Sequence, residues 1–158
     1  MDTILAPETA FPILHVPVFA AWLLLILAPG WHWTRRMVHE AWIPLGLSVI
    51  YSAMLVWGLA FGGAPEGSGF TTLRGVMTLF TSPAAMLNGW IHYLAFDLFV
   101  GAWIARDAMR RSLPHFLVAP CQLLTLLYGP LGFLGYFALR WHKGAATLSM
   151  QETPGDRP

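Results

Sequence analysis

Long uncharged runs, separated by short polar stretches, make up most of this chain. No Asp, Glu, Lys or Arg falls inside three of them, which lie at residues 9–34, 41–65 and 112–139. A fourth run, residues 75–105, is interrupted by a single charge at Asp97. About 20 apolar residues are enough for a helix to cross a bilayer, and a helix closes its own backbone hydrogen bonds in lipid. The pattern predicts four membrane helices, at about residues 11–28, 42–62, 86–105 and 116–139.

The segment between the second and third predicted helices is different. Residues 62–69 are rich in Gly and Pro, which breaks any helix and marks a connection. Residues 70–83 are too few to cross a membrane, so a short interfacial or re-entrant helix is expected there. The predicted fold class is an all-α membrane protein: a bundle of four transmembrane helices in one domain, residues 1–143. The polar tail, residues 144–158, is expected to be disordered.

Composition supports an integral, multi-pass membrane protein. Of the 158 residues 56% are hydrophobic and 11% are charged, which excludes the surface chemistry of a soluble enzyme. The net charge of +1 removes any bulk electrostatic case for nucleic acid. The only cysteine, Cys121, excludes an intramolecular disulfide and a thiolate metal cluster. The N-terminus lacks a basic leader and a cleavage site, so the first segment is expected to be retained.

Basic residues give a weak prediction of orientation. Five follow the first and third predicted helices, and four lie on the opposite side. The two groups are Arg35, Arg36, Arg106, Arg110 and Arg111, and then Arg74, Arg140, Lys143 and Arg157. The positive-inside rule then favours both termini outside. The cluster at residues 106–111 is interpreted as a topology signal and headgroup anchor.

Asp97 is the most informative single residue, because a carboxylate in the middle of a membrane helix costs roughly 2.5 to 3.5 kcal/mol on insertion scales. It can be protonated, or paired with His92, with Arg74 or with an arginine of the following loop. A purely structural pair remains an alternative, but intramembrane ionisable groups are functional candidates by default. Asn88 and His92 share one face of this helix, and Tyr93 and Asp97 share another. His92 and Asp97 lie about 140° apart around the helix axis.

Two further polar stripes are candidates for lining a pocket, although hydrogen bonds between packed helices explain such residues equally well. The second helix carries Ser48, Tyr51 and Ser52, and the fourth carries Cys121, Gln122, Thr125, Tyr128 and Gly132. Gly129-Pro130 and Pro120 are expected to bend the fourth helix. The six histidines do not have the paired spacing of membrane di-iron sites, and HExxH and GxSxG motifs are missing. Chemistry without a metal or cofactor is therefore the simpler expectation.

A family resemblance rests on residues 88–101, which read NGWIHYLAFDLFVG. Matching residues continue in order with Trp103-Ile104, Arg106-Asp107-Ala108, His115, Ala119-Pro120-Cys121, Leu124-Thr125 and Gly129-Pro130-Leu131-Gly132. This pattern resembles the plant abscisic-acid-deficient-four proteins, the neoxanthin-synthase-like membrane proteins. It covers about residues 70–140. The short start without a plastid transit region leads us to expect a bacterial member in the inner membrane.

The resemblance implies a small membrane protein that converts a 5,6-epoxy carotenoid or related isoprenoid to an allenic isomer. Such a reaction needs an acid at the epoxide oxygen and a base at a vinylic proton. A carboxyl group in hydrocarbon favours its neutral form, so Asp97 is the candidate acid and His92 the candidate base. Candidate substrate-binding residues are Asn88, Tyr93, Gln122, Thr125 and Tyr128. The expected partners are membrane lipids and this hydrophobic substrate, and an oligomer of identical chains is left open.

Two other functions compete with the isomerase. One is a proton-coupled carrier in which Asp97 titrates in a water path, although four helices are few for a transporter and no inverted repeat is visible. The other is a structural or assembly protein in which Asp97 is a buried polar anchor. A hydrated path to both sides would favour the carrier, and a fixed partner for Asp97 would favour assembly.

Overall fold

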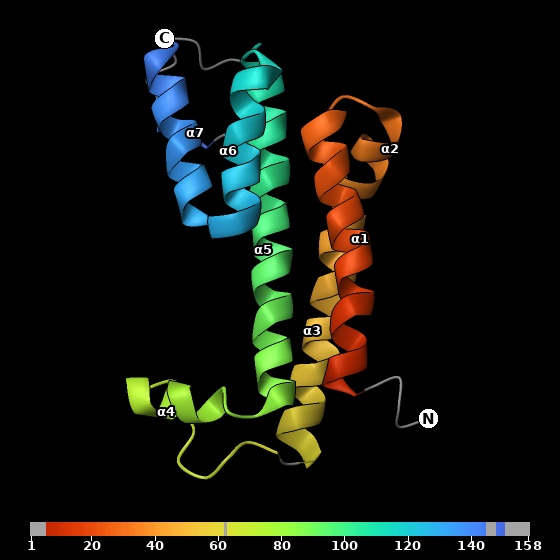
Figure 1. Ribbon diagram of the computed structural model, residues 1–158, viewed down its shortest axis with the longest axis vertical. Helices are drawn as coiled ribbons and strands as arrows, with labels where there is room; N and C mark the ends of the chain where they lie inside the picture. The colour runs from red at the N-terminus through yellow and green to blue at the C-terminus, as the bar shows by residue number, and fades with distance from the viewer. Residues whose placement is uncertain (1–5, 62, 145–147, 151–158) are drawn as a thin grey trace.

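A computed structural model describes residues 6–61, 63–144 and 148–150. Three long helices lie side by side: α1 (Pro7–Leu27), α3 (Trp42–Phe61) and α5 (Pro83–Arg110) (Figure 1). The short α2 (His32–Thr34) and η1 (Arg35–His39) join α1 to α3. With 28 residues, α5 is about 42 Å long. It is the central helix, because α1, α3 and the C-terminal helices all pack against it.

The larger core cluster lies where α1, η1 and α3 pack on α5, and a second cluster lies between α5, α6 and α7. Trp22 and Leu25 of α1 are almost fully buried against Leu98 and Ala102 of α5. Gly101 permits this close approach, because a Cβ at that position would lie 2.5 Å from Cη2 of Trp22. The missing side chain therefore decides how near α1 and α5 can come.

The short helix expected between the second and third membrane helices is present as α4 (Leu73–Leu79). Thr72 begins it by accepting a hydrogen bond from the Gly75 amide at 3.0 Å. It runs roughly perpendicular to the long helices and extends to one side of the bundle, at the end where α3 ends and α5 starts (Figure 1). Phe80, which follows α4, packs on Gly89 of α5.

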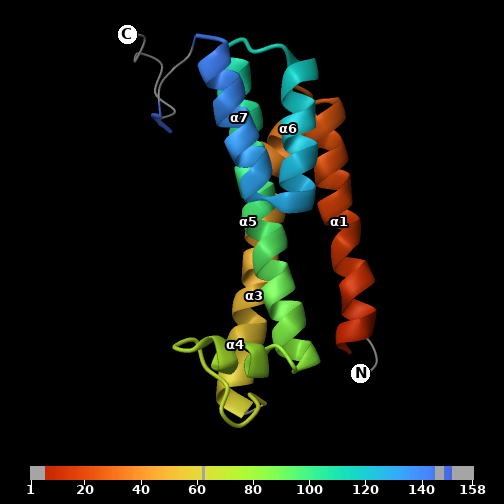
Figure 2. The same ribbon diagram turned by 60° about the vertical axis from the view of Figure 1, so that its left-hand side comes forward.

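The single fourth helix predicted at residues 116–139 is wrong. The structure has two helices there, α6 (His115–Tyr128) and α7 (Pro130–His142), folded back on each other as a hairpin (Figure 2). Gly129 has φ +35°, which L side chains rarely adopt, and Pro130 cannot donate a backbone hydrogen bond. The expected bend at Gly129-Pro130 is therefore a full reversal, whereas Pro120 lies inside α6 without ending it.

Close contact at one glycine holds the two arms of the hairpin together. A Cβ on Gly132 of α7 would overlap the backbone nitrogen and the hydroxyl of Thr125 in α6, and would lie 2.5 Å from the carbonyl oxygen of Cys121. Figures 1 and 2 agree in placing the hairpin beside only the C-terminal half of α5. The bundle therefore has three long helices and a half-length hairpin in place of four equivalent helices.

The helices differ in whether they are long and apolar enough to cross a membrane. The α1 helix and the helical stretch His32–Phe61 are long and apolar enough to cross a membrane. With 14 and 13 residues, α6 and α7 are each about 20 Å long, shorter than the roughly 30 Å hydrocarbon core. The third predicted helix corresponds to α5, which starts earlier and ends later than expected. Residue 62 and most of the predicted tail, 144–158, lie outside the described residues.

Candidate functional site

The Asp97 carboxyl group lies near the midpoint of α5 and faces the turn of the hairpin. A Cβ at Gly129 would be 2.7 Å from Oδ1 and 3.2 Å from Oδ2 of Asp97, so only glycine leaves room for the carboxyl group here. Asp97 is partly buried, and its Oδ2 atom has no hydrogen-bond partner among the described residues. The helix break and the acidic residue, 32 positions apart in the sequence, thus form one site.

Tyr93 completes the polar part of this site. It lies one helical turn before Asp97 on the same face of α5, and its hydroxyl group is within hydrogen-bonding reach of the carboxyl group. The first turn of α7 begins at the hairpin turn, and the amide groups of a first turn have no partner inside their own helix. A phenol, a carboxyl group and a helix start are therefore the hydrogen-bonding groups offered at this place.

Apolar side chains surround the same turn on the outside of the molecule. Leu127 and Leu131, on either side of the turn, are more than half exposed, and so is Tyr128. Tyr128, one of the predicted substrate-binding residues, directly precedes Gly129 and is 62% exposed. The outer surface of the molecule beside the turn is therefore apolar.

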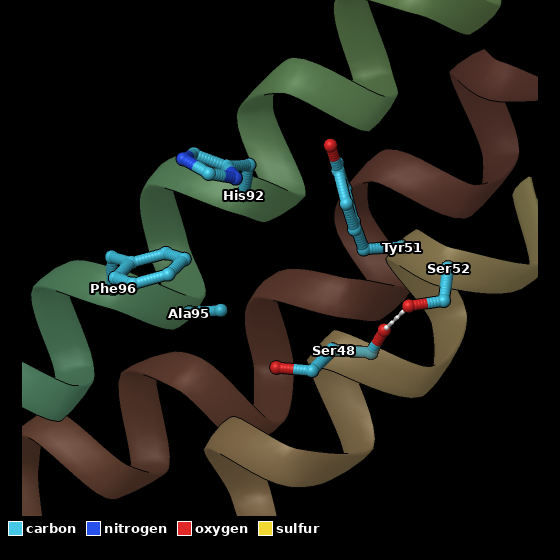
Figure 3. A pocket seen from close by; sticks show the side chains of 6 residues that line it. All are labelled: Ser48, Tyr51, Ser52, His92, Ala95 and Phe96. Carbon is cyan, nitrogen blue, oxygen red and sulfur yellow. Dashed lines mark hydrogen bonds between the residues drawn. The ribbon is translucent and has the colours of Figure 1, made fainter. Parts of the chain in front are cut away.

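His92 belongs to a different feature, an open pocket of about 310 Å³ between α3 and α5 (Figure 3). Its ring lies 5.4 Å from the Tyr51 ring and 4.7 Å from the Phe96 ring, measured between centroids. Ser48 and Ser52 of α3 form the opposite wall. Their hydroxyl groups donate 2.8 Å hydrogen bonds to backbone carbonyls one turn earlier, so the oxygen lone pairs remain for a ligand.

The structure does not bring His92 and Asp97 together. His92 faces α3, whereas Asp97 faces the turn between α6 and α7. Asn88 lies one turn before His92, and its Oδ1 atom is buried with no hydrogen-bond partner in the described part of the chain. The predicted catalytic residues and their neighbours therefore divide into two sites on α5.

Gln122 and Thr125 lie inside the protein and are fully buried. The Thr125 hydroxyl donates a 2.8 Å hydrogen bond to the Cys121 carbonyl, and Gly132 of α7 covers it. Neither side-chain polar atom of Gln122 has a hydrogen-bond partner within the described ranges. A ligand could contact these two predicted binding residues only if the helices packed around them moved apart.

The charged cluster at residues 106–111, interpreted from the sequence as a topology signal and headgroup anchor, contains a buried ion-pair network at the C-terminal end of α5. Asp107 is 1% exposed, and its carboxylate accepts hydrogen bonds from Arg110 at 3.2 Å, Arg111 at 2.9 Å and Tyr136 at 2.6 Å. Arg140 lies 3.5 Å from the same carboxylate and is equally buried. The spacing of Asp107 to Arg110 and Arg111 signals a local ion pair. The contacts with α7 depend on the hairpin and leave no signal in the sequence.

Arg140 is held from several sides. Its guanidinium lies 4.7 Å from the centroid of the Phe137 ring, and it donates a 3.1 Å hydrogen bond to the carbonyl of Ser149. This Asp107 cluster ties α7, and through Arg140 also Ser149, to the end of α5. It fixes one end of the hairpin while the other end meets Asp97. Within the described residues, no group of three His, Cys, Asp or Glu side chains could hold a metal ion.

Comparison with known proteins gives one match. The family model described as ABA DEFICIENT 4-like matches residues 9–136, about four fifths of the chain. No curated protein and no solved structure matches the sequence. The matched range includes most of α1, all of α3 and α5, the turn at Gly129 and most of the hairpin.

Proposed function

This chain belongs to the ABA DEFICIENT 4-like family, and from that premise we propose that it is a multi-pass membrane protein that isomerises an epoxy carotenoid or related isoprenoid. The product would be an allenic alcohol of the same composition. The observation that carries the proposal is the position of Asp97, midway along α5 against the turn at Gly129. An ionisable residue at that depth, next to broken helices, is typical of a functional site in a membrane protein.

The surroundings of Asp97 suit a long apolar substrate. Leu127, Tyr128 and Leu131 expose apolar surface beside the turn, where lipid would surround the protein. The hydroxyl of Tyr93 and the amides at the start of α7 could orient a single oxygen atom. A polyene could therefore lie along the hairpin with its epoxide end at the carboxyl group.

One carboxyl group can both donate and accept the protons that move in the isomerisation. Neutral Asp97 donates its proton to the epoxide oxygen while the carbon–oxygen bond next to the polyene breaks. The resulting carboxylate then takes the vinylic proton from the adjacent carbon, and the electron pair of that C–H bond forms the second double bond of the allene. The oxygen stays on the substrate as a hydroxyl group. Asp97 ends the cycle protonated, and no oxidant or reductant is consumed.

His92 was the expected base, and its position assigns it a secondary role in this proposal. A substrate that touched both Asp97 and His92 would have to wrap around α5. Because the two oxygens of one carboxyl group can serve as acid and base in turn, the reaction at Asp97 does not need the imidazole. The pocket around His92 could instead hold another part of the substrate.

The test is conversion of a 5,6-epoxy carotenoid by the protein in membranes, followed by chromatography with absorption and mass detection. Asp97→Asn keeps the shape of the side chain and removes the acid, so conversion should fall at least about a hundredfold. Glu66→Gln, in an exposed loop, is the matched control and should convert at the wild-type rate. Conversion by Asp97→Asn at the wild-type rate would overturn the proposal.

A further inference from the structure

We infer that the basic end of this molecule is a surface that binds the anionic phospholipid headgroups of the cytoplasmic leaflet. The inference rests on the membrane location contained in the proposed function. It does not depend on the substrate or the reaction. The hairpin decides on which side of the membrane the C-terminal basic residues lie. A single crossing helix would place them on the opposite side.

Both ends of the hairpin are fixed at one end of the bundle. At its start, the His115 ring is hydrogen-bonded to the carbonyl of Ile26, near the end of α1, at 2.7 Å. Near its other end, Arg140 of α7 lies 3.5 Å from the carboxylate of Asp107, near the end of α5. The hairpin therefore enters and leaves at the same level, and its turn lies midway along α5 beside Asp97.

The arms of the hairpin are too short to cross. Each of α6 and α7 is about 20 Å long against a hydrocarbon core of roughly 30 Å. Non-helical backbone at membrane depth is tolerated where protein covers it, and Gly129 is buried. If α5 crosses the membrane together with α1 and α3, the chain crosses three times. Pro7 at the start of α1 and His142 at the end of α7 then lie on opposite sides.

This topology gathers the basic residues on one side. Seven of the eight in the described part of the chain belong to the end that holds η1, the end of α5 and the end of α7 (Figure 1). They are Arg35, Arg36, Arg106, Arg110, Arg111, Arg140 and Lys143. The opposite end has Arg74 with the acidic Glu8 and Glu66. The excess of basic residues on one side of the membrane, which is small for four crossings, is therefore large for three.

The chemistry of this end fits lipid phosphate groups. Arg35, Arg36 and Lys143 are exposed, and Asp107, one of the two described acidic residues there, is buried and paired. Basic residues next to membrane helices are retained on the cytoplasmic side, where anionic lipids attract each one by about 1 kcal/mol. Exposed Trp31 and Trp33 lie just before Arg35, as expected for a headgroup layer.

Orientation is tested by single cysteines in a Cys121→Ala background, labelled by a membrane-impermeant maleimide in intact bacterial cells and again after lysis. Thr71→Cys before α4 should label in intact cells. Met37→Cys in η1 and Met150→Cys after α7 should label only after lysis. Labelling of Met150→Cys together with Thr71→Cys in intact cells would overturn the re-entrant hairpin. Recovery of the protein in the soluble fraction would instead contradict the membrane location and with it the proposed function.

Headgroup binding is tested by native mass spectrometry of the purified protein in micelles that contain equal amounts of phosphatidylglycerol and phosphatidylcholine. The double variant Arg35→Gln/Arg36→Gln should bind phosphatidylglycerol about tenfold more weakly or worse than wild type. Arg74→Gln, at the opposite end, is the matched control and should bind it like wild type. Equal retention of the two lipids by wild type, or an equal loss in the control, would overturn the basic surface as a lipid site.

Discussion

The carboxyl group of Asp97 lies against backbone atoms at Gly129, so its surroundings depend on a turn in the chain. The turn at Gly129 places backbone amide groups near the Asp97 carboxyl group and leaves room beside it. A packed side chain would fill that room. Only Gly fits, because φ is +35° and a Cβ would contact the carboxylate oxygens. At the scale of single residues, Asp97 and Gly129 form one unit.

His92 provides the sharpest comparison with Asp97. Because His92 faces Tyr51 and Phe96 in another pocket, His92→Gln should change conversion of an epoxy carotenoid by less than about threefold, while Asp97→Asn lowers it about a hundredfold or more. The measurement is the rate of product formation at saturating substrate. Equal losses in the two variants would show that both residues act on the reacting atoms and would contradict a single-carboxyl mechanism.

Asp107 should matter for stability more than for chemistry. Asp107→Asn leaves the buried guanidinium of Arg140 facing a neutral amide, and uncompensated buried charges cost about 3 to 5 kcal/mol. The expected result is a clear drop in the thermal unfolding midpoint in detergent. Tyr136→Phe removes only one hydrogen bond and should cost about 1 kcal/mol. An unchanged midpoint in Asp107→Asn would mean that this cluster does not stabilise the fold.

At the scale of elements, the hairpin is stabilised by small residues where α6 and α7 meet. Gly132 has no room for a side chain, while a Cβ at Gly135 would find Cys121 Sγ as its nearest neighbour, at an ordinary 3.8 Å. The two glycines lie one turn apart on the same helix. The main difference between the two positions is the distance to α6, which is much shorter at Gly132.

Gly132→Ala should therefore destabilise the protein by about 1 to 3 kcal/mol, because backbone atoms of α6 would have to move. Gly135→Ala is the matched control and should be neutral or slightly stabilising, since alanine is the better helix former. Both are measured by thermal unfolding in the same detergent. Equal effects of the two substitutions would contradict the packing of α6 on α7.

At the scale of the whole molecule, the hairpin makes the two ends of the bundle different. One end carries the basic surface and the Asp107 cluster, and the other carries α4 and the Gly-rich loop. The proposed reaction site lies midway between them. An epoxide end group would reach Asp97 only by sliding along the membrane plane to the hairpin turn, which suits a substrate dissolved in lipid.

A distance measurement tests this arrangement. Spin labels at Phe116 and Trp141, both exposed, should be close together because the hairpin brings the two ends side by side. A continuous helix would separate the labels by about 38 Å. The control pair Phe116 and Leu127 lies within α6 and should give about 17 Å in either case. A Phe116–Trp141 separation near the longer value would refute the hairpin.

The sequence by itself determined the helical class, the apolar segments of α1 and α3, the short helix after the Gly-rich loop, and the position of Asp97 inside an otherwise uncharged run of residues. These depend on uncharged length and on single groups that lipid tolerates poorly, so they are visible in a local pattern. Family membership was likewise readable from the motif around Asp97, and the family match confirms it. The separation of His92 from Asp97 also followed from helix periodicity alone.

Only the tertiary structure decided what the break at Gly129-Pro130 does. A Gly-Pro pair permits any angle from a mild kink to a full reversal, because it removes a helix hydrogen bond without specifying a new direction. The reversal is selected by contacts between distant residues, Gly132 with Thr125 and Tyr136 with Asp107. The same contacts bring Gly129 to Asp97 and gather the basic residues at one end. Local sequence carries no signal for such pairings, because each depends on surfaces formed elsewhere in the chain.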